Sequence, residues 1–254
     1  NLQNIPIRSE LGRELRRYFI PENGDYILIG ADYSQIELRL LADISGDEHM
    51  IGAFLRGDDI HTITASQVFG VPADKVTPAM RKNAKAVNFG IVYGIGDYSL
   101  SQDLHITRHE AAEYIEGYFR TYPGVREYMR RTVVAAHEHG YVATRQGRRR
   151  YIPELTAKKK QLVSFGERVA MNSPIQGEAA DIIKRAMIDA DAALRDAGLD
   201  ARLILQVHDE LLVEARAADA DRAAAILRDK MEHAVNLSVP LVAETATGKT
   251  WYDV

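Results

Sequence analysis

The chain has 254 residues, of which 46% are hydrophobic and 27% charged, and its formal net charge is −4. This composition is typical of a soluble globular protein and excludes a disordered or collagen-like chain. No cysteine is present, which excludes a disulfide scaffold and thiolate zinc sites and favours a reducing compartment. The apolar runs are too short to cross a bilayer and no signal-like segment is visible, so we expect a cytoplasmic protein.

Charge is distributed unevenly along the sequence. Residues 141–160 contain seven basic side chains and one acidic side chain, whereas residues 201–254 contain six basic and nine acidic side chains. Such asymmetry is expected of a polyanion-binding protein that keeps carboxylates at a chemical centre. A solvated basic loop would give the same pattern, so charge alone leaves both interpretations open.

The first predicted elements are a strand and a helix. Residues 26–31 form a short apolar run that is typical of a buried strand, and Asp32 follows at its end. Ser34 and Glu37 have the spacing of a helix capping box. We therefore expect a helix to begin immediately after the strand, with Asp32 at the exposed strand end.

A long helical region follows, from about residue 46 to residue 171. Thr77-Pro78 predicts a helix start, and Thr107 with Glu110 predicts a capping box. The basic segment 140–160 is expected to form a hairpin or loop. Ser173-Pro174 is expected to break the helix that comes next.

The C-terminal part is rich in predicted strands. Residues 203–207 and 210–214 are two short apolar runs joined at His208-Asp209, which predicts a hairpin. A helix over 218–234 and a strand over 239–243 complete the chain. The order of elements predicts a mixed α/β fold in which a sheet domain is interrupted by a helical subdomain.

Two aspartates could form a metal site. Asp32 follows one predicted strand and Asp209 lies at the tip of the predicted hairpin, so their carboxylates converge if the strands are neighbours. Carboxylates without cysteine or clustered histidine favour Mg²⁺. Two such ions about 3.5–4 Å apart would activate an attacking oxygen and stabilise a leaving one. Asp is also common at helix caps and turns, and that simpler interpretation stays open for each residue alone.

A stripe of side chains on the helix after Thr77 supports a chemical role. Arg81, Lys85, Phe89 and Tyr93 are spaced by four residues and so share one slowly winding face. Two cations suit a polyphosphate, and the aromatic side chains beyond them suit a sugar and a base. The alternative is an ordinary amphipathic helix with an aromatic core face.

Five segments together resemble family A DNA polymerases, the bacterial DNA polymerase I type. The three long motifs are residues 32–39 (DYSQIELR), residues 81–94 (RKNAKAVNFGIVYG) and residues 207–210 (VHDE). Residues 1–6 (NLQNIP) and 172–177 (NSPIQG) resemble further family segments. The resemblance covers essentially the whole chain in order.

The resemblance implies a right-hand polymerase fold, with a palm sheet formed by residues 1–45 and 171–254 and mostly helical fingers formed by residues 46–170. It implies template-directed DNA synthesis, in which a deoxynucleotide is transferred to a primer 3′-hydroxyl and pyrophosphate is released. The implied cofactor is a pair of Mg²⁺ ions. The implied partners are primer-template DNA and deoxynucleoside triphosphates, with no membrane, and the thumb and N-terminal domains of a parent enzyme are expected to be missing.

The same resemblance assigns roles to individual residues. Asp32 and Asp209 would hold the metal ions together with the backbone carbonyl of Tyr33, Glu210 would be an auxiliary carboxylate, and Lys85 would be the general acid for the departing pyrophosphate. The implied nucleotide-binding residues are Ser34, Gln35, Ile36, Glu37, His61, Arg81, Lys85, Phe89 and Tyr93.

Within that set, Glu37 would exclude a ribose 2′-hydroxyl, and Phe89 would pack on the sugar and disfavour nucleotides that lack a 3′-hydroxyl. Tyr93 would lie at the template base. The implied DNA contacts are Asn1, Asn4 and Arg8 on the primer side, Arg168, Asn172, Gln176 and His208 near the template and terminal pair, and Arg148, Arg149 and Arg150 on template phosphate.

Two other functions remain as alternatives at this point. One is a catalytically idle DNA-binding fragment of a polymerase that lacks its thumb. The other is a two-metal phosphodiester hydrolase, although a nuclease needs neither a triphosphate clamp nor a sugar gate.

Overall fold

The computed structural model describes residues 2–5 and 9–254. The chain divides into two compact units. The first unit comprises Asn1–Ile36, Ala179–Asn236 and Leu241–Val254, and the second comprises Glu37–Glu178 and Leu237–Pro240. The mixed fold class expected from the sequence is confirmed, because one unit is built on an antiparallel sheet and the other is mostly helical.

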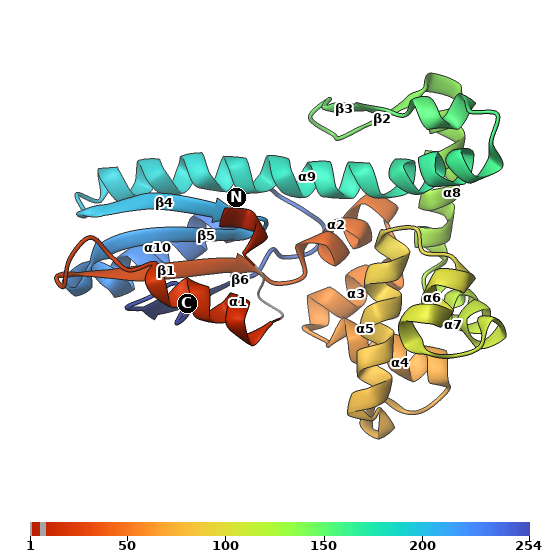
Figure 1. Cartoon of the computed structure of the whole chain (residues 1–254), viewed down its shortest axis with the longest axis horizontal. Coiled ribbons are helices and arrows are strands. Elements are labelled where there is room, and N and C mark those ends of the chain that lie inside the picture. Colours follow the sequence, from red (N-terminus) through yellow and green to blue (C-terminus); the bar gives the residue numbers. More distant parts are fainter. Residues whose placement is uncertain (1, 6–8) are drawn as a thin grey trace. The chain divides into compact units, whose positions relative to one another are not determined.

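A four-stranded antiparallel sheet forms the centre of the first unit (Figure 1), with the strand order β4-β5-β1-β6. The strands are β1 (Tyr26–Tyr33), β4 (Ala201–Val207), β5 (Glu210–Arg216) and β6 (Ala243–Gly248). The predicted strand before Asp32 and the predicted hairpin at His208-Asp209 are both confirmed. Strand β1 is central and pairs with β5 on one side and β6 on the other.

The apolar runs form strands here because both faces of the central pair are covered. In β1 Leu28 and Ile29 are buried, and in β5 so is Leu212. Leu28 and Leu212 pack in one core cluster with Trp251, whose ring meets Phe19 edge to face at 5.3 Å between centroids. Helix α10 packs against β1, β5 and β6. The other elements of this unit are η1 (Leu2–Asn4), α1 (Glu10–Leu15), η2 (Arg16–Tyr18), η5 (Ala217–Asp219) and α10 (Ala220–Glu232).

The last strand lies later in the sequence than expected. Residues 239–243 were expected to form a strand because they are apolar, but only Ala243 belongs to β6. Val239 and Leu241 are buried in irregular backbone instead. Strand β6 is an edge strand that pairs with β1 alone, so it does not need a continuous apolar run. Its polar sequence AETATG therefore gives little strand signal.

The second unit is helical apart from one small hairpin. Its elements are α2 (Ile36–Ser45), α3 (Glu48–Arg56), α4 (Ile60–Phe69), η3 (Ala73–Lys75), α5 (Pro78–Val92), α6 (Asp97–Leu104), α7 (Arg108–Thr121), α8 (Pro123–His139), β2 (Tyr141–Ala143), β3 (Arg149–Tyr151) and η4 (Pro153–Thr156). Helix α9 (Lys160–Asp196) begins in this unit and ends in the first. The basic hairpin expected over residues 140–160 is confirmed as β2 and β3.

Helix starts follow the capping signals in two of three places. The Thr77 side chain accepts a hydrogen bond from the Met80 amide at 3.2 Å, and Thr107 with Glu110 forms a complete capping box. The helix expected after Ser34 is present as α2, but it begins at Ile36, because Gln35 takes a left-handed φ of 57°. A turn therefore separates β1 from its helix.

The predicted break at Ser173-Pro174 is also wrong, because α9 runs through Pro174 as one helix of 37 residues. A proline inside a helix costs about 3 kcal/mol, since one backbone hydrogen bond is lost. Burial of Ala170 and Ile175 on either side offsets this cost. Within the described ranges 2–5 and 9–254, no helix combines the length and the apolar character needed to span a bilayer.

Candidate active site

Acidic side chains gather where β1 ends and β4 turns into β5. Asp32 is paired in register with Glu210, and the Tyr33 amide donates to the Asp209 carbonyl at 3.2 Å. The pKa of Asp32 is raised to about 7, first by burial and then by the negative charges of Asp209, Glu210 and Glu244. Burial also raises the pKa of Asp209. The sheet therefore concentrates acidic side chains at this edge.

This donor set fits a hard divalent cation. Burial is the main cause of both raised pKa values, and the charge of His208 opposes it only for Asp209. Oxygen ligands such as these carboxylates are what Mg²⁺ prefers. The Tyr33 hydroxyl is turned away and donates to the Met231 carbonyl at 2.6 Å, so only the Tyr33 backbone carbonyl is left as a ligand. No group of three or more His, Cys, Asp or Glu side chains among the described residues could hold a metal by itself. Any ion here would need further oxygens from substrate or water.

Glu210 is held within the protein. Its Oε1 accepts from the Trp251 indole nitrogen at 2.9 Å, and its Oε2 lies 3.6 Å from the Arg16 guanidinium. The Arg16 guanidinium in turn lies 4.1 Å from the centre of the Trp251 ring. Glu210 thus contributes negative potential beside Asp32 while both of its oxygens are engaged elsewhere.

The remaining candidates of the first unit lie on its surface. His208 occupies the turn between β4 and β5 with a left-handed φ of 52°, and its carbonyl accepts from the Gln206 side chain at 2.6 Å. Asn4 is exposed in η1. Asn1 and Arg8 lie outside the described residues.

In the second unit, helices α4 and α5 bring together four of the predicted nucleotide-binding residues. The Lys85 ammonium lies 5.9 Å from the centre of the Phe89 ring, and the His61 ring centre lies 6.0 Å from it. Charges on Arg81 and Lys85 also act on His61. The spacing of four along α5 therefore does produce a cationic and aromatic face, and His61 joins it from α4.

Arg81 has a partner that the sequence analysis missed. Its Nε lies 2.5 Å from Asp59 Oδ2, and Asp59 is also the N-cap of α4. Burial alone would raise the pKa of Asp59, but hydrogen bonds from Arg81, Thr62 and the His61 amide lower it to about 2. A phosphate that recruits Arg81 must compete with this carboxylate. The capping pattern of Asp59 could have been found in the sequence, but its pairing with Arg81 could not.

His61 is buried, with 3% of its surface exposed. Burial first, and then the neighbouring cations, lower its pKa to about 4 against the opposing effect of Asp59. Its Nδ1 lies 2.9 Å from the side-chain nitrogen of Asn88, a residue that the sequence analysis did not identify as functional. His61 is therefore a neutral group near pH 7.

Glu37 and Tyr93 are brought together. The Tyr93 hydroxyl donates to both oxygens of the Glu37 carboxylate, at 3.1 and 3.2 Å. The predicted sugar gate and the predicted template-base residue are thus hydrogen-bonded to each other. Ser34, Gln35 and Ile36 form the turn from β1 into α2, where the Ser34 amide donates to the Val242 carbonyl at 2.8 Å.

A groove of about 620 Å³ collects most of the predicted template contacts. Arg148, Arg149 and Arg150 line it from the hairpin, and Asn172 and Gln176 line it from α9. Arg168 lies one turn before Asn172. The Asn172 side chain also donates to the Val92 carbonyl at 3.2 Å, which joins α9 to the end of α5.

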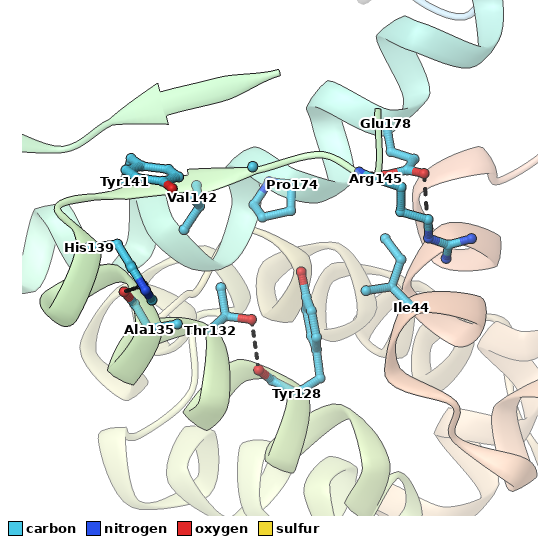
Figure 2. Close-up of a pocket in the computed structure, with 11 residues that line it drawn as sticks. Ile44, Tyr128, Thr132, Ala135, His139, Tyr141, Val142, Arg145, Pro174 and Glu178 are labelled. Carbon is cyan, nitrogen blue, oxygen red and sulfur yellow. Dashed lines mark hydrogen bonds and ion pairs between the residues drawn. The ribbon is translucent and has the colours of Figure 1, made fainter. Parts of the chain in front are cut away.

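The hairpin is anchored by charged residues that sequence reasoning did not identify. The Arg145 amide donates to Glu178 Oε2 at 3.2 Å, and the Arg145 guanidinium pairs with Asp43. Figure 2 shows Arg145 and Glu178 beside a cavity of about 360 Å³, with Tyr128 and Pro174 among its lining residues. Asp43 and Glu178 are 102 and 33 residues from Arg145, so no local pattern reveals these contacts.

Comparison with known proteins gives a consistent result. The model of DNA polymerase family A matches residues 1–253. DNA polymerase I of Bacillus subtilis is 56% identical over 253 residues, and that of Bacillus caldotenax is 55% identical. Both alignments cover 100% of this chain and 29% of the relative, so the chain spans less than a third of the length of these relatives. The POL domain of Pol1 from M. smegmatis, solved with DNA primer-template and dNTP, superposes with a TM-score of 0.94 at 47% identity, covering 100% of this chain and 45% of that one.

Proposed function

Because the chain belongs to DNA polymerase family A, we propose that it carries out template-directed DNA synthesis. A primer 3′-hydroxyl attacks the α-phosphorus of a deoxynucleoside triphosphate, the bond to pyrophosphate breaks, and the hydroxyl proton passes to solvent water. The observation that carries this proposal is the pair of neighbouring half-buried carboxylates, Asp32 on β1 and Asp209 in the turn that leads into β5. The alternatives are an idle DNA-binding fragment and a hydrolase.

Asp32 and Asp209 would hold two Mg²⁺ ions, with the Tyr33 carbonyl as a further ligand. When bound, these ions would favour the ionised 3′-hydroxyl and neutralise charge that develops on the phosphates. Glu210 would keep the local potential negative while it is anchored by Trp251 and Arg16. The chain's own contribution is to orient the two carboxylates beside each other at this edge of the sheet.

The nucleotide would engage the face formed by α4 and α5. Lys85 would donate a proton to the departing pyrophosphate, and Arg81 would leave Asp59 to bind phosphate oxygens in a bidentate manner. Phe89 would pack on the sugar and His61 would donate to the triphosphate. Exchange of Arg81 between a carboxylate and a phosphate would link nucleotide binding to the start of α4.

Sugar and template selection would involve Glu37 and Tyr93. Tyr93 holds the Glu37 carboxylate through two hydrogen bonds, which fixes the group that would exclude a 2′-hydroxyl. Ser34, Gln35 and Ile36 would approach the nucleotide through the turn after β1. Formation of the correct pair between the nucleotide and the template base would displace Tyr93 from the template position and so change the contacts of Glu37.

The DNA would lie along the groove of the hairpin and α9. Arg148, Arg149 and Arg150 would contact template phosphates, whereas Arg168, Asn172 and Gln176 would contact the duplex near the terminal pair. His208, Asn4, Asn1 and Arg8 remain predicted contacts. Amide side chains suit minor-groove acceptors, which check the geometry of the pair rather than its sequence.

The triple variant Arg148→Ala, Arg149→Ala, Arg150→Ala is expected to weaken DNA binding and to reduce its salt dependence. Each lost phosphate contact removes about 0.9 from the slope of log K against log salt, so the slope should fall by about 2–3. Fluorescence anisotropy of labelled primer-template across a salt series measures both quantities. The control is Arg130→Ala, Arg131→Ala, because these exposed α8 residues pair with Glu127 away from the groove. An unchanged slope in the triple variant would show that these three arginines do not contact DNA phosphates.

Single-nucleotide extension of a primed template with Mg²⁺ tests the proposed function. We expect incorporation that follows the template base, prefers deoxynucleotides over ribonucleotides, and disappears in Asp209→Ala. DNA binding by the same variant should persist, because the basic hairpin is unaltered. Salt-sensitive binding without extension by the wild-type protein would favour the idle fragment, and degradation of the primer would favour the hydrolase.

A further inference from the structure

A buried series of hydrogen bonds leads through the second unit to His61. The Tyr122 hydroxyl lies 3.4 Å from Thr64 Oγ1, which lies 3.0 Å from Asn88 Oδ1, and the Asn88 side-chain nitrogen lies 2.9 Å from His61 Nδ1. Tyr122 lies between α7 and α8, Thr64 and His61 are on α4, and Asn88 is on α5. Tyr122, Thr64 and Asn88 are each 0% exposed. Three helical segments therefore contribute to one polar connection inside an apolar core.

The direction of the hydrogen bonds follows from the phenol at one end. A buried hydroxyl with an acceptor within reach donates its hydrogen to that acceptor, since leaving the hydrogen bond unmade costs about 1–3 kcal/mol. Within the part of the chain that the structure describes, the side chain of Tyr122 has Thr64 Oγ1 as its hydrogen-bond partner. Burial raises the pKa of Tyr122 to about 12, so the phenol keeps its hydrogen. Tyr122 must therefore donate to Thr64.

The rest of the series is then determined. Thr64 has one hydrogen, and because it accepts from Tyr122 it donates that hydrogen to Asn88 Oδ1. With its oxygen toward Thr64, Asn88 turns its NH₂ group toward His61. An amide NH₂ only donates, so His61 Nδ1 must accept, and the hydrogen of the neutral imidazole must be on Nε2.

The other ring nitrogen is the one that can meet a ligand. Among the described residues, the fully buried side-chain nitrogens and oxygens without a partner are Arg16 Nε, Tyr118 Oη and Tyr128 Oη. His61 Nε2 is not in this group and has no hydrogen-bond partner within those residues, so it retains access to solvent. The ring lies beside Phe89, and the charges of Arg81 and Lys85 act on it.

We propose that Asn88 is a positioning residue that holds His61 in the Nε2–H tautomer, so that the ring presents a hydrogen-bond donor to the triphosphate. Tyr122 and Thr64 fix the orientation of the Asn88 amide. The part concerning the triphosphate rests on the proposed function, whereas the tautomer does not. Phosphate oxygens accept hydrogen bonds, so the opposite tautomer would face them with a lone pair. A neutral donor also avoids placing a buried cation next to the positive charges of Arg81 and Lys85.

Nitrogen-15 NMR of the protein labelled in its histidine rings tests the tautomer directly. The chain has eight histidines, so the His61 signals are assigned by their loss in His61→Gln. At pH 7 we expect Nδ1 at the shift of an unprotonated nitrogen and Nε2 at that of a protonated one. The reverse assignment in the wild-type protein would overturn the proposal.

Substitutions remote from the ring test the cause. Thr64→Ser keeps the hydroxyl and should keep the wild-type tautomer, whereas Thr64→Val has a similar shape without the hydroxyl and should populate the Nδ1–H form. Tyr122→Phe leaves the Thr64 hydroxyl able to donate or accept, so it should populate the Nδ1–H form less than Thr64→Val does. Asn88→Asp replaces the donor with a carboxylate and should switch the ring to Nδ1–H completely. Wild-type spectra in Thr64→Val and Asn88→Asp would show that this series does not set the tautomer.

Nucleotide kinetics test the positioning role. Asn88→Asp should raise the KM for the deoxynucleotide by about 10- to 100-fold, the effect of one lost hydrogen bond to a charged group, and change kcat less. Thr64→Ser should keep the wild-type KM, whereas Thr64→Val should raise it although Asn88 is unaltered, which a merely structural defect at Asn88 would not predict. An unchanged KM with a switched tautomer would overturn the positioning role. If the wild-type protein shows the expected tautomer but extends no primer, the proposed function fails and the tautomer assignment stands.

Discussion

Asp32→Asn is expected to abolish nucleotide incorporation and, in the absence of metal, to stabilise the protein near pH 8. Incorporation is lost because an amide cannot replace the charge of a carboxylate ligand, and we expect a decrease of at least about 10³-fold. Stability increases because the substitution removes a charge that burial disfavours first and the neighbouring acids disfavour second. After a discount for solvent on the open side of Asp32, the gain should be about 1–2 kcal/mol.

The pH dependence has a definite sign. The pKa of Asp32 is about 7 in the folded protein and near 3.8 in the unfolded chain, so the folded state binds more protons between these values. The contribution of Asp32 to the free energy of unfolding therefore decreases as pH rises from about 4 to about 7, and it is constant above that range. The difference between Asp32→Asn and wild type should be largest above pH 7 and should shrink as pH falls. Urea unfolding in EDTA at several pH values measures it.

Glu244→Gln is the matched control for this prediction. Glu244 lies opposite Asp32 in the β1–β6 register and also raises its pKa, but it is exposed and no metal role is proposed for it. It should give a smaller gain in stability with incorporation retained. Added Mg²⁺ should stabilise wild type and Glu244→Gln but not Asp32→Asn. A destabilised Asp32→Asn protein at pH 8 would show that the aspartate is compensated in the fold.

Gly94→Ala is expected to destabilise the protein by about 2–5 kcal/mol. Gly94 follows α5 with a φ of 67°, which costs a residue with a Cβ about 1–2 kcal/mol. A Cβ here would also lie 2.8 Å from Met171 Cε and 3.3 Å from the Cα of Arg168. Backbone of α9 cannot move aside easily, and overpacking of this kind adds about 1–3 kcal/mol. The same substitution should weaken DNA binding, because it displaces the turn of α9 that carries Arg168.

Alanine variants of two other glycines distinguish the cost of backbone strain from the cost of steric overlap. Gly57 has a φ of 74° with no atom within 4 Å of a built Cβ, so Gly57→Ala should cost only the strain of about 1 kcal/mol. Gly24 has neither feature, and Gly24→Ala should be neutral or slightly stabilising. Urea unfolding compares all three variants. Equal losses for Gly94→Ala and Gly57→Ala would mean that α9 accommodates the extra methyl group.

The elements that could be predicted are those with a local cause. Strand β1 follows from its continuous apolar run, and the starts at Thr77 and Thr107 follow from hydrogen bonds within one turn. Strand β6 was misplaced because an edge strand needs no apolar pattern. The helix through Pro174 was missed because packing along a long helix outweighs one lost hydrogen bond.

The site divides in the same way. The convergence of Arg81 and Lys85 follows from helical spacing, and the closeness of Asp32 and Asp209 follows from two strands that proved to be neighbours. Other contacts in the site join residues that are distant in sequence. Asn88 meets His61 across 27 residues, and Glu210 meets Trp251 across 41. Such contacts depend on how elements pack, so no local pattern contains them.

The protein has one tryptophan, Trp251, which is fully buried and hydrogen-bonded to the residue next to Asp209. Its fluorescence is therefore an optical probe of the first unit alone, with an indole shielded from quenchers while the sheet is intact. Charge changes around Glu210 will shift its emission before any unfolding occurs. Events confined to the second unit, such as those at Gly94 and His61, give no tryptophan signal of their own, and they require circular dichroism, NMR or an introduced dye.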